Sequence, residues 1–250
     1  MMTSFSLAWQ FLTIFPGWKR EPGVTPLLLG RSMAFYPVIG LILGLILWGV
    51  RWVFSFLLPS PLSDGLVILL LALFTGALHL DGLADTLDGW GGGKTPEEKL
   101  RIMKDHQIGS FGVVGLIFIL GLKFLALQSL SEEVAAQALL IALVLSRGSM
   151  VQLLYRSPYA RREGGLGSAF KENLAKREMV IATVVSLALA FFFFHFSGVL
   201  LWLTTGLCTL GLQALSKKMI GGVTGDVLGA SNEINEVLAL VFLSGLFYTF

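Results

Sequence analysis

Long apolar stretches dominate this sequence and restrict what it can fold into more than any other feature. Seven of them are candidate membrane spans, near residues 33–57, 65–80, 111–130, 134–154, 179–197, 198–215 and 235–250. A helix needs about 20 mainly apolar residues to cross a bilayer, where it satisfies its own backbone polar groups. Only 14% of the residues are charged, against about a quarter in soluble proteins. The sequence therefore predicts an all-α, polytopic membrane helix bundle of about seven spans, forming a single domain over residues 1–250.

The N-terminal segment precedes these spans and is too short to be one of them. Phe5, Trp9, Leu12 and Phe15 recur within it at helical spacing. We expect a helix that lies in the membrane interface or packs against the bundle.

Basic residues are distributed unevenly among the loops. Fifteen of the 18 Lys and Arg residues precede the first span or follow the second, fourth and sixth spans. They are Lys19, Arg20, Arg31, Lys94, Lys99, Arg101, Lys104, Arg156, Arg161, Arg162, Lys171, Lys176, Arg177, Lys217 and Lys218. The opposite loops, around 58–64, 131–133 and 195–198, contain none. Because cytoplasmic loops carry the excess of basic residues, the pattern predicts a cytoplasmic N-terminus and a functional site on the cytoplasmic face.

The other three basic residues, Arg51, Lys123 and Arg147, fall inside predicted spans. We expect Arg51, near a span end, to extend its charged group toward water. Arg147 falls near the cytoplasmic end of its span, where an anion could reach it. The net charge of +2 is too small to indicate nucleic acid as a partner.

Three aspartates follow the second apolar stretch. Asp81, Asp85 and Asp88 are spaced i, i+4 and i+7, which places them on one helical face. Three carboxylates so close together would repel one another, and a divalent cation such as Mg²⁺ or Mn²⁺ removes the repulsion. The alternative is a solvated helix end. The spacing thus predicts a metal site where the second span reaches the cytoplasm.

The residues around these aspartates allow several interpretations. His79 could act as a base, bind a substrate group, or be a hydrogen-bonded histidine of the core. The glycines at 89 and 91–93 would permit a sharp exit from the helix and close approach to a ligand, although a flexible loop would look the same.

Two further polar sets are predicted on the same face. The first, KDHQIGSFG at 104–112, offers Lys104, Asp105 and Gly109 before the third span. The second, GGVTGDVLGASNEINEV at 221–237, contains Asp226 and leads into the last span, where Ser231 or Asn232 could cap the helix. Carboxylates that hold a metal, together with Lys and Arg that hold phosphate, are typical of phosphoryl or substituted-phosphoryl transfer.

Five segments together resemble the cobalamin synthase (adenosylcobinamide-GDP ribazoletransferase) family. They are FLTIFPG at 11–17, FYPVIGLILG at 35–44, LHLDGLADTLDG at 78–89, MKDHQIGSFGVVGL at 103–116 and TGDVLGASNEINEV at 224–237. The resemblance implies a multi-pass enzyme of the inner (cytoplasmic) membrane that uses Mg²⁺. Its small-molecule substrates would be adenosylcobinamide-GDP and α-ribazole or its 5′-phosphate, with GMP released. The family's acidic motif maps onto Asp81, Asp85 and Asp88, its D-x-x-x-G element onto Asp105 and Gly109, and its TGD element onto Asp226.

These observations lead to a set of predicted roles. The predicted catalytic residues are Asp81, Asp85 and His79. The predicted metal ligands are Asp81, Asp85, Asp88, Asp105 and Asp226. The predicted substrate-binding residues are Lys104, Arg147, Gly109, Asn232, Glu233 and Glu236.

Two other functions remain as alternatives at the level of sequence. A CDP-alcohol phosphotransferase also uses an acidic membrane motif that opens with D-G-x-x-A, although Asp85 stands where that family has Arg. An ion-coupled transporter also places acids within broken membrane helices. The sequence leaves open whether the chain forms a homo-oligomer.

Overall fold

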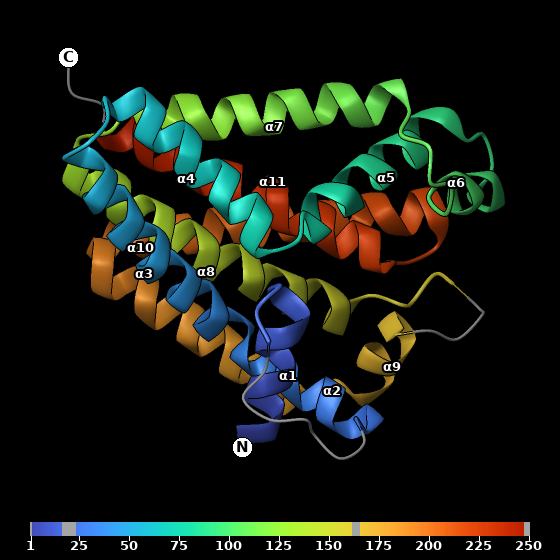
Figure 1. Ribbon diagram of the computed structural model, residues 1–250. Coiled ribbons are helices and arrows are strands. Elements are labelled where there is room, and N and C mark those ends of the chain that lie inside the picture. Colours follow the sequence, from blue (N-terminus) through green and yellow to red (C-terminus); the bar gives the residue numbers. More distant parts are fainter. Residues whose placement is uncertain (1, 17–23, 162–165, 248–250) are drawn as a thin grey trace.

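The computed structural model describes residues 2–16, 24–161 and 166–247 and is almost entirely helical in these ranges (Figure 1). Its elements are α1 (Met2–Leu12), α2 (Pro26–Ser32), the 3₁₀ helix η1 (Met33–Phe35), α3 (Tyr36–Ser55), α4 (Ser60–Phe74), α5 (Leu78–Gly92), α6 (Pro96–Ile102), α7 (Ser110–Gln128), α8 (Glu132–Arg156), α9 (Leu166–Asn173), α10 (Lys176–Ile220) and α11 (Gly225–Phe247). The predicted all-α class is confirmed. The basic residues Lys19, Arg20 and Arg162 lie outside the described residues.

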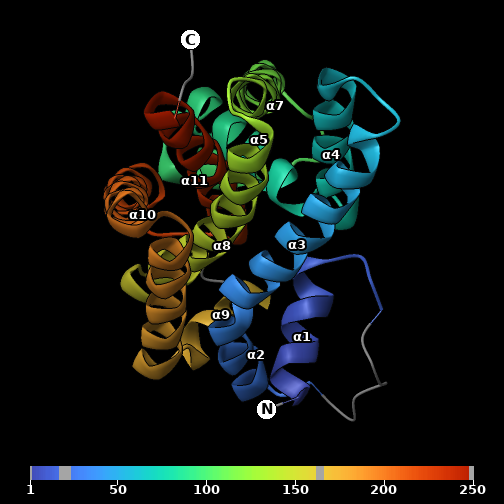
Figure 2. The same ribbon diagram turned by 90° about the vertical axis from the view of Figure 1, so that its left-hand side faces the viewer.

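Helix α8 forms the centre of the bundle, with α3, α10 and α11 packed around it (Figure 2). Its middle turns are apolar on every side, as expected of a helix that is covered all round. Helix α3 approaches α8 at Gly40 and Gly44, where an added Cβ would collide with Leu143 and Leu140. Small residues of this kind let two backbones pack closely without a driving force from water.

Among the residues that the structure describes, five helical segments are long and apolar enough to cross a membrane. These are Pro26–Ser55, α7, α8, α10 and α11. Helices α4 and α5 pass the same test only as a pair, bent by 86°. These helices agree with the multi-pass membrane protein that the sequence predicts. The count is therefore five spans, or six if the bent pair is one span, and it does not confirm the predicted seven.

The predicted second span at 65–80 is wrong as one continuous helix. Helix α4 ends at Phe74, and the chain turns through Gly76 and Ala77, whose φ angles are 59° and 55°. Ala77 is strained there because its Cβ crowds the backbone in the left-handed region. The aspartates therefore lie along a separate helix, α5, which is bent away from the apolar helix α4.

The two predicted spans at 179–197 and 198–215 fall within α10. A straight helix of 45 residues would be about 68 Å long, more than twice the hydrocarbon thickness. Helix α10 is broken at His195, where φ is 51° and ψ is −128°. A Cβ at Gly198 would collide with the Ala190 carbonyl, so the backbone bends tightly there. In Figure 2 the two arms run in different directions, which matches the predicted division.

Helix α11 begins at Gly225, ten residues before the predicted start of the last span at 235. The expected cap at Ser231 or Asn232 is wrong, because both residues are buried inside the helix. Helices α5 and α11 cross at Gly82 and Gly229. A Cβ at Gly82 would lie 2.8 Å from the Asp226 carbonyl oxygen, and one at Gly229 would lie 3.2 Å from His79. This crossing brings the acidic helix α5 against the start of α11.

Arg51 does not reach toward water as expected. It is buried on α3, and its Nε donates to Asp64 Oδ1 of α4 at 2.7 Å. The other carboxylate oxygen of Asp64 accepts from Gln128 at the end of α7. Charged groups inside a membrane protein are costly unless they are paired, and here the pair ties three helices together.

Candidate functional site

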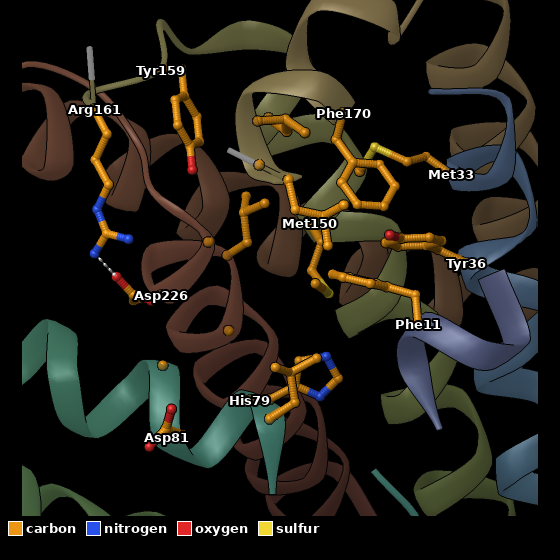
Figure 3. Close-up of a pocket in the computed structure, with 18 of the residues that line it drawn as sticks. Phe11, Met33, Tyr36, His79, Asp81, Met150, Tyr159, Arg161, Phe170 and Asp226 are labelled. Carbon is orange, nitrogen blue, oxygen red and sulfur yellow. Dashed lines mark hydrogen bonds and ion pairs between the residues drawn. The ribbon is translucent and has the colours of Figure 1, made fainter. Parts of the chain in front are cut away.

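A cavity of about 350 Å³ lies among α1, α3, α5, α8, α9 and the start of α11 (Figure 3). One end is polar and is lined by Asp81, Lys104, Tyr159, Arg161 and Asp226. The other end is apolar and is lined by Phe11, Met33, Tyr36, Met150, Leu154 and Phe170. A mainly apolar cavity with a few convergent polar groups is the usual form of a small-molecule site.

An ion pair at the polar end joins the loop after α8 to the start of α11. Arg161 Nη2 donates to Asp226 Oδ2 at 2.7 Å, and both side chains are about one-fifth exposed. Thr224 Oγ1 donates to the same oxygen at 3.1 Å. The loop is held in place because the amide of Ala160 donates to the Val223 carbonyl at 2.9 Å. Burial raises the pKa of Tyr159, which lies beside this pair.

Sequence reasoning did not identify Arg161 as a site residue. It counted only among the basic residues of a cytoplasmic loop, where nothing local distinguishes it from its neighbours. Its role depends on the contact between residues 158–160 and 223, which are far apart in the chain. Phe11 and Tyr36 were quoted only as parts of family motifs, and the cavity gives both a defined position.

Three of the five predicted metal ligands lie around the polar end. Asp81 is exposed and lines the cavity together with Asp226. Asp85, one turn further along α5, interacts electrostatically with the carboxylates of Asp81 and Asp226 and with the Arg161 guanidinium. Several acids therefore share this end with few cations, which favours a bound cation or proton.

Asp88 has a different environment from the other two aspartates of α5. Its carboxylate accepts hydrogen bonds from the amides of Gly109 at 2.7 Å and Gly112 at 2.8 Å. A Cβ at either glycine would collide with this carboxylate. Asp88 thus fixes the start of α7, and the Gly109 amide, predicted to bind substrate, is already occupied.

Asp105 also lies apart from the acids of the cavity. It is exposed, and its Oδ1 accepts from the Gln107 amide at 3.2 Å. Its neighbour Lys104 does line the cavity. Within the described ranges, no three His, Cys, Asp or Glu side chains converge as a preformed metal site.

The glycines that follow the aspartates serve packing between helices. The helix exit expected within the glycines at 89 and 91–93 falls at their end, because α5 continues to Gly92 and the backbone is extended at Gly93. A Cβ at Gly89 would collide with Met103, and one at Gly91 would lie 2.6 Å from Phe111. These glycines let the segment from α6 to α7 lie against α5.

Four predicted substrate-binding residues form part of a buried ionic network. Lys123 of α7 donates at 2.6 Å to both Glu233 and Glu236 of α11. Glu236 also pairs with Arg147 of α8, and Asn232 donates to Glu233 at 3.3 Å. These side chains are at least nine-tenths buried and are absent from the described lining of the cavity. The network balances two cations against two anions between helices.

His79 lines the cavity between its two ends, as Figure 3 shows. It is 1% exposed, and neither ring nitrogen has a hydrogen-bond partner within the described part of the chain. The interpretation of His79 as a hydrogen-bonded core histidine is therefore wrong for the described residues. A buried imidazole without a partner is costly, which suits a group that a ligand completes.

Comparisons with known proteins address the whole chain. The family model described as CobS, cobalamin-5-phosphate synthase, matches residues 4–244. A protein of Syntrophobacter fumaroxidans named adenosylcobinamide-GDP ribazoletransferase is 41% identical, over 96% of this chain and 97% of the relative. Proteins of the same name from Geotalea daltonii and Pseudomonas entomophila are 37% and 40% identical, over 97% of this chain and 97% and 99% of theirs. No solved structure matches the chain significantly.

The family match covers both helices that cross at the cavity and all the residues at its two ends. The resemblance seen in the sequence motifs is therefore confirmed, and the chain belongs to the CobS family of cobalamin-5-phosphate synthases.

Proposed function

We propose that this chain is an adenosylcobinamide-GDP ribazoletransferase that joins adenosylcobinamide-GDP to α-ribazole, or to its 5′-phosphate, and releases GMP. Family membership and the names of the relatives support this function. The observation that carries it is the cavity, where carboxylates and cations at one end meet an aromatic wall at the other. The reaction needs both kinds of surface, since it brings a diphosphate together with a nucleoside.

The chemistry follows from the groups at the polar end. A ribose hydroxyl of α-ribazole attacks the phosphorus next to the cobinamide, a new P–O bond forms, and the P–O bond to GMP breaks. Arg161 and Lys104 bind phosphate oxygens, because cations stabilise the charge that develops in phosphoryl transfer. Asp81 accepts the hydroxyl proton, with Asp85 or His79 as alternatives. Positioning and electrostatics then account for catalysis without a covalent enzyme intermediate.

We also propose that the reaction depends on Mg²⁺. The donor chemistry fits, because Asp81, Asp85 and Asp226 offer hard oxygen ligands in an acid-rich environment. Mg²⁺ usually takes one or two protein carboxylates together with substrate phosphates, so a preformed protein cluster is not required. When bound, it would offset negative charge on the diphosphate. Asp88 and Asp105 are less suited to this role, given their present hydrogen bonds.

The test is GMP release by purified protein in detergent or liposomes, with adenosylcobinamide-GDP, α-ribazole and Mg²⁺. We expect wild-type protein to release GMP only with both substrates, and Asp81→Asn to lose at least about 100-fold in kcat. Glu97→Gln, an exposed acid on α6, is the matched control and should behave as wild type. Undiminished GMP release by Asp81→Asn would exclude Asp81 from the mechanism. GMP release in the presence of EDTA would exclude the dependence on a metal ion.

Family membership favours this transferase over the two alternatives considered from the sequence. CMP release from a CDP-alcohol by the same preparation would favour the phosphotransferase. Substrate-dependent ion flux in liposomes without a chemical product would favour the transporter.

A further inference from the structure

The apolar end of the cavity is built from aromatic rings on three separate elements. Phe11 of α1 stacks on Tyr36 of α3, with ring centroids 6.3 Å apart and an interplanar angle of 19°. Phe11 also contacts Phe170 of α9 at a centroid distance of 4.9 Å. Tyr36 and Phe170 are 1% and 4% exposed. Figure 3 shows the three rings and Met33 gathered on the side opposite Asp226 and Arg161.

Flat rings that line one end of a cavity favour a flat, largely apolar ligand. Aromatic groups gain from stacked and edge-to-face contacts beyond the burial of their area. Few hydrogen-bonding groups are available here, namely the Tyr36 hydroxyl and, at the boundary, His79. A base with many donors and acceptors would leave several of them unpaired on entering, and each would cost free energy.

The reaction of the proposed function supplies two heteroaromatic bases, the guanine of the GDP and the benzimidazole-type base of α-ribazole. Guanine carries an amide, an amino group and ring acceptors along its edges. The benzimidazole base carries far fewer polar groups and is mostly hydrocarbon. The apolar end therefore favours the ribazole base over guanine. Guanine would leave polar groups unpaired there, and unpaired polar groups also cause other binding sites to reject a ligand.

The size of the cavity agrees with this choice. About 350 Å³ is at the lower limit for sites that hold a drug-sized molecule, so it suits a nucleoside. A corrin ring with its amide side chains is far larger and would have to remain outside. Only the diphosphate end of adenosylcobinamide-GDP would then reach Asp81 and Arg161.

We propose that Phe11, Tyr36 and Phe170 form the binding site for the base of α-ribazole, with His79 hydrogen-bonded to its ribose. This assignment rests on the proposed function. It places the ribose between the aromatic and polar ends, so that a hydroxyl is directed toward the phosphates. It also gives the His79 imidazole the partner that the described residues do not supply.

The test measures KM separately for the two substrates in Phe11→Leu and Tyr36→Leu. Loss of a stacking face should raise KM for α-ribazole about tenfold or more and leave KM for adenosylcobinamide-GDP and inhibition by GMP unchanged. Phe35→Leu is the matched control, since Phe35 contacts Phe5 and is not among the described lining residues. If Tyr36→Leu does not fold, Phe11→Leu, a partly buried position on the outer helix α1, decides the question.

Two results would overturn the assignment. An unchanged KM for α-ribazole in folded Phe11→Leu would exclude the aromatic end as its site. A rise in KM for adenosylcobinamide-GDP, with weaker inhibition by GMP, would assign this end to guanine. For His79, we expect His79→Gln to retain more affinity for α-ribazole than His79→Leu. A fall in kcat in both variants without a change in KM would make His79 the proton acceptor instead.

Failure of the proposed function can be recognised separately. Wild-type protein without transferase activity would refute that function, whatever the variants do. Equilibrium binding of α-ribazole alone, by calorimetry on wild type and Phe11→Leu, would still test the aromatic site. Equal affinity in the two proteins, or absence of binding to wild type, would refute the site.

Discussion

At the scale of single residues, the polar end of the cavity depends on one basic side chain more than the loop sequence suggests. Arg161 is the cation that pairs with Asp226 and interacts with Asp85. Nearby Lys104 lines the same end, so two cations face several acids. Under the proposed function, this balance would let the polar end accept a diphosphate together with a divalent cation.

Replacement of Arg161 tests this balance. Arg161→Ala should lower kcat/KM for adenosylcobinamide-GDP about 10- to 100-fold, because a hydrogen bond to a charged group is worth about 1.5–3 kcal/mol. Arg161→Lys should recover only part of the loss, since Lys cannot bind two phosphate oxygens with a planar fork. Arg101→Ala, at an exposed position on α6, is the control. The proposed contact would be refuted if Arg161→Ala raised only KM for α-ribazole.

At the scale of elements, glycines decide which helices approach closely enough to build the site. Gly82 and Gly229 allow α5 to cross α11, and Gly109 and Gly112 allow the start of α7 to lie on Asp88. In each case a Cβ would contact backbone or a carboxylate that is already fixed. Replacing one of these glycines by a larger residue should therefore displace a helix, because the atoms that the new side chain meets cannot move aside on their own.

Gly112→Ala should lower stability by about 1–3 kcal/mol, as is typical of overpacking, and should also lower activity by displacing Asp88. Gly121→Ala on the same helix is the control, since no atom lies within 4 Å of its added Cβ. Alanine there should be neutral or slightly stabilising. Thermal unfolding in detergent measures both. Equal melting temperatures for the two variants would contradict the packing argument.

The ionic network between α7, α8 and α11 makes a second prediction at this scale. Lys123→Met leaves two buried carboxylates with one cation, and loss of one partner of a buried pair costs about 3–5 kcal/mol. Adding Glu233→Gln should restore much of the melting temperature, because Arg147 and Glu236 remain balanced. A double variant as unstable as Lys123→Met would refute charge balance. A stable but inactive double variant would support the predicted substrate role of Glu233.

At the scale of the whole molecule, the basic loops and the non-basic loops occupy different ends of the bundle. In Figure 1 the connections α3–α4 and α7–α8 lie at the left, whereas α6 lies at the right. Helices α4 and α5 together run between these ends in spite of their bend. This arrangement agrees with the orientation predicted from the basic loops, in which the α6 end would face the cytoplasm.

Cysteine labelling tests this orientation. The chain has a single cysteine, Cys208, so Cys208→Ser provides a clean background. With Lys94→Cys, an impermeant maleimide should label inverted vesicles and not intact spheroplasts. With Ser131→Cys the reverse should hold, and both positions are exposed. Labelling of Lys94→Cys from outside would invert the proposed topology.

The sequence by itself determined the class of fold, the positions of most helices and the family. These properties follow from local patterns, because runs of apolar residues specify membrane helices and short motifs retain their spacing. The positive φ at Ala77 was not predictable in this way. Alanine normally avoids that region, and contacts elsewhere, such as the packing of α5 on α11, must offset the cost of the turn.

Only the tertiary structure decided which acids share the site. Asp81, Asp85 and Asp88 look equivalent at i, i+4 and i+7, yet Asp88 is held by the amides of Gly109 and Gly112. Asp226 joins the site, and Glu233 and Glu236 on the same helix enter the buried network. The direction of a side chain depends on what packs against its helix, and those partners are remote in the chain. The sequence therefore identified the acids but not Arg161, and helix packing selected the groups that face the cavity.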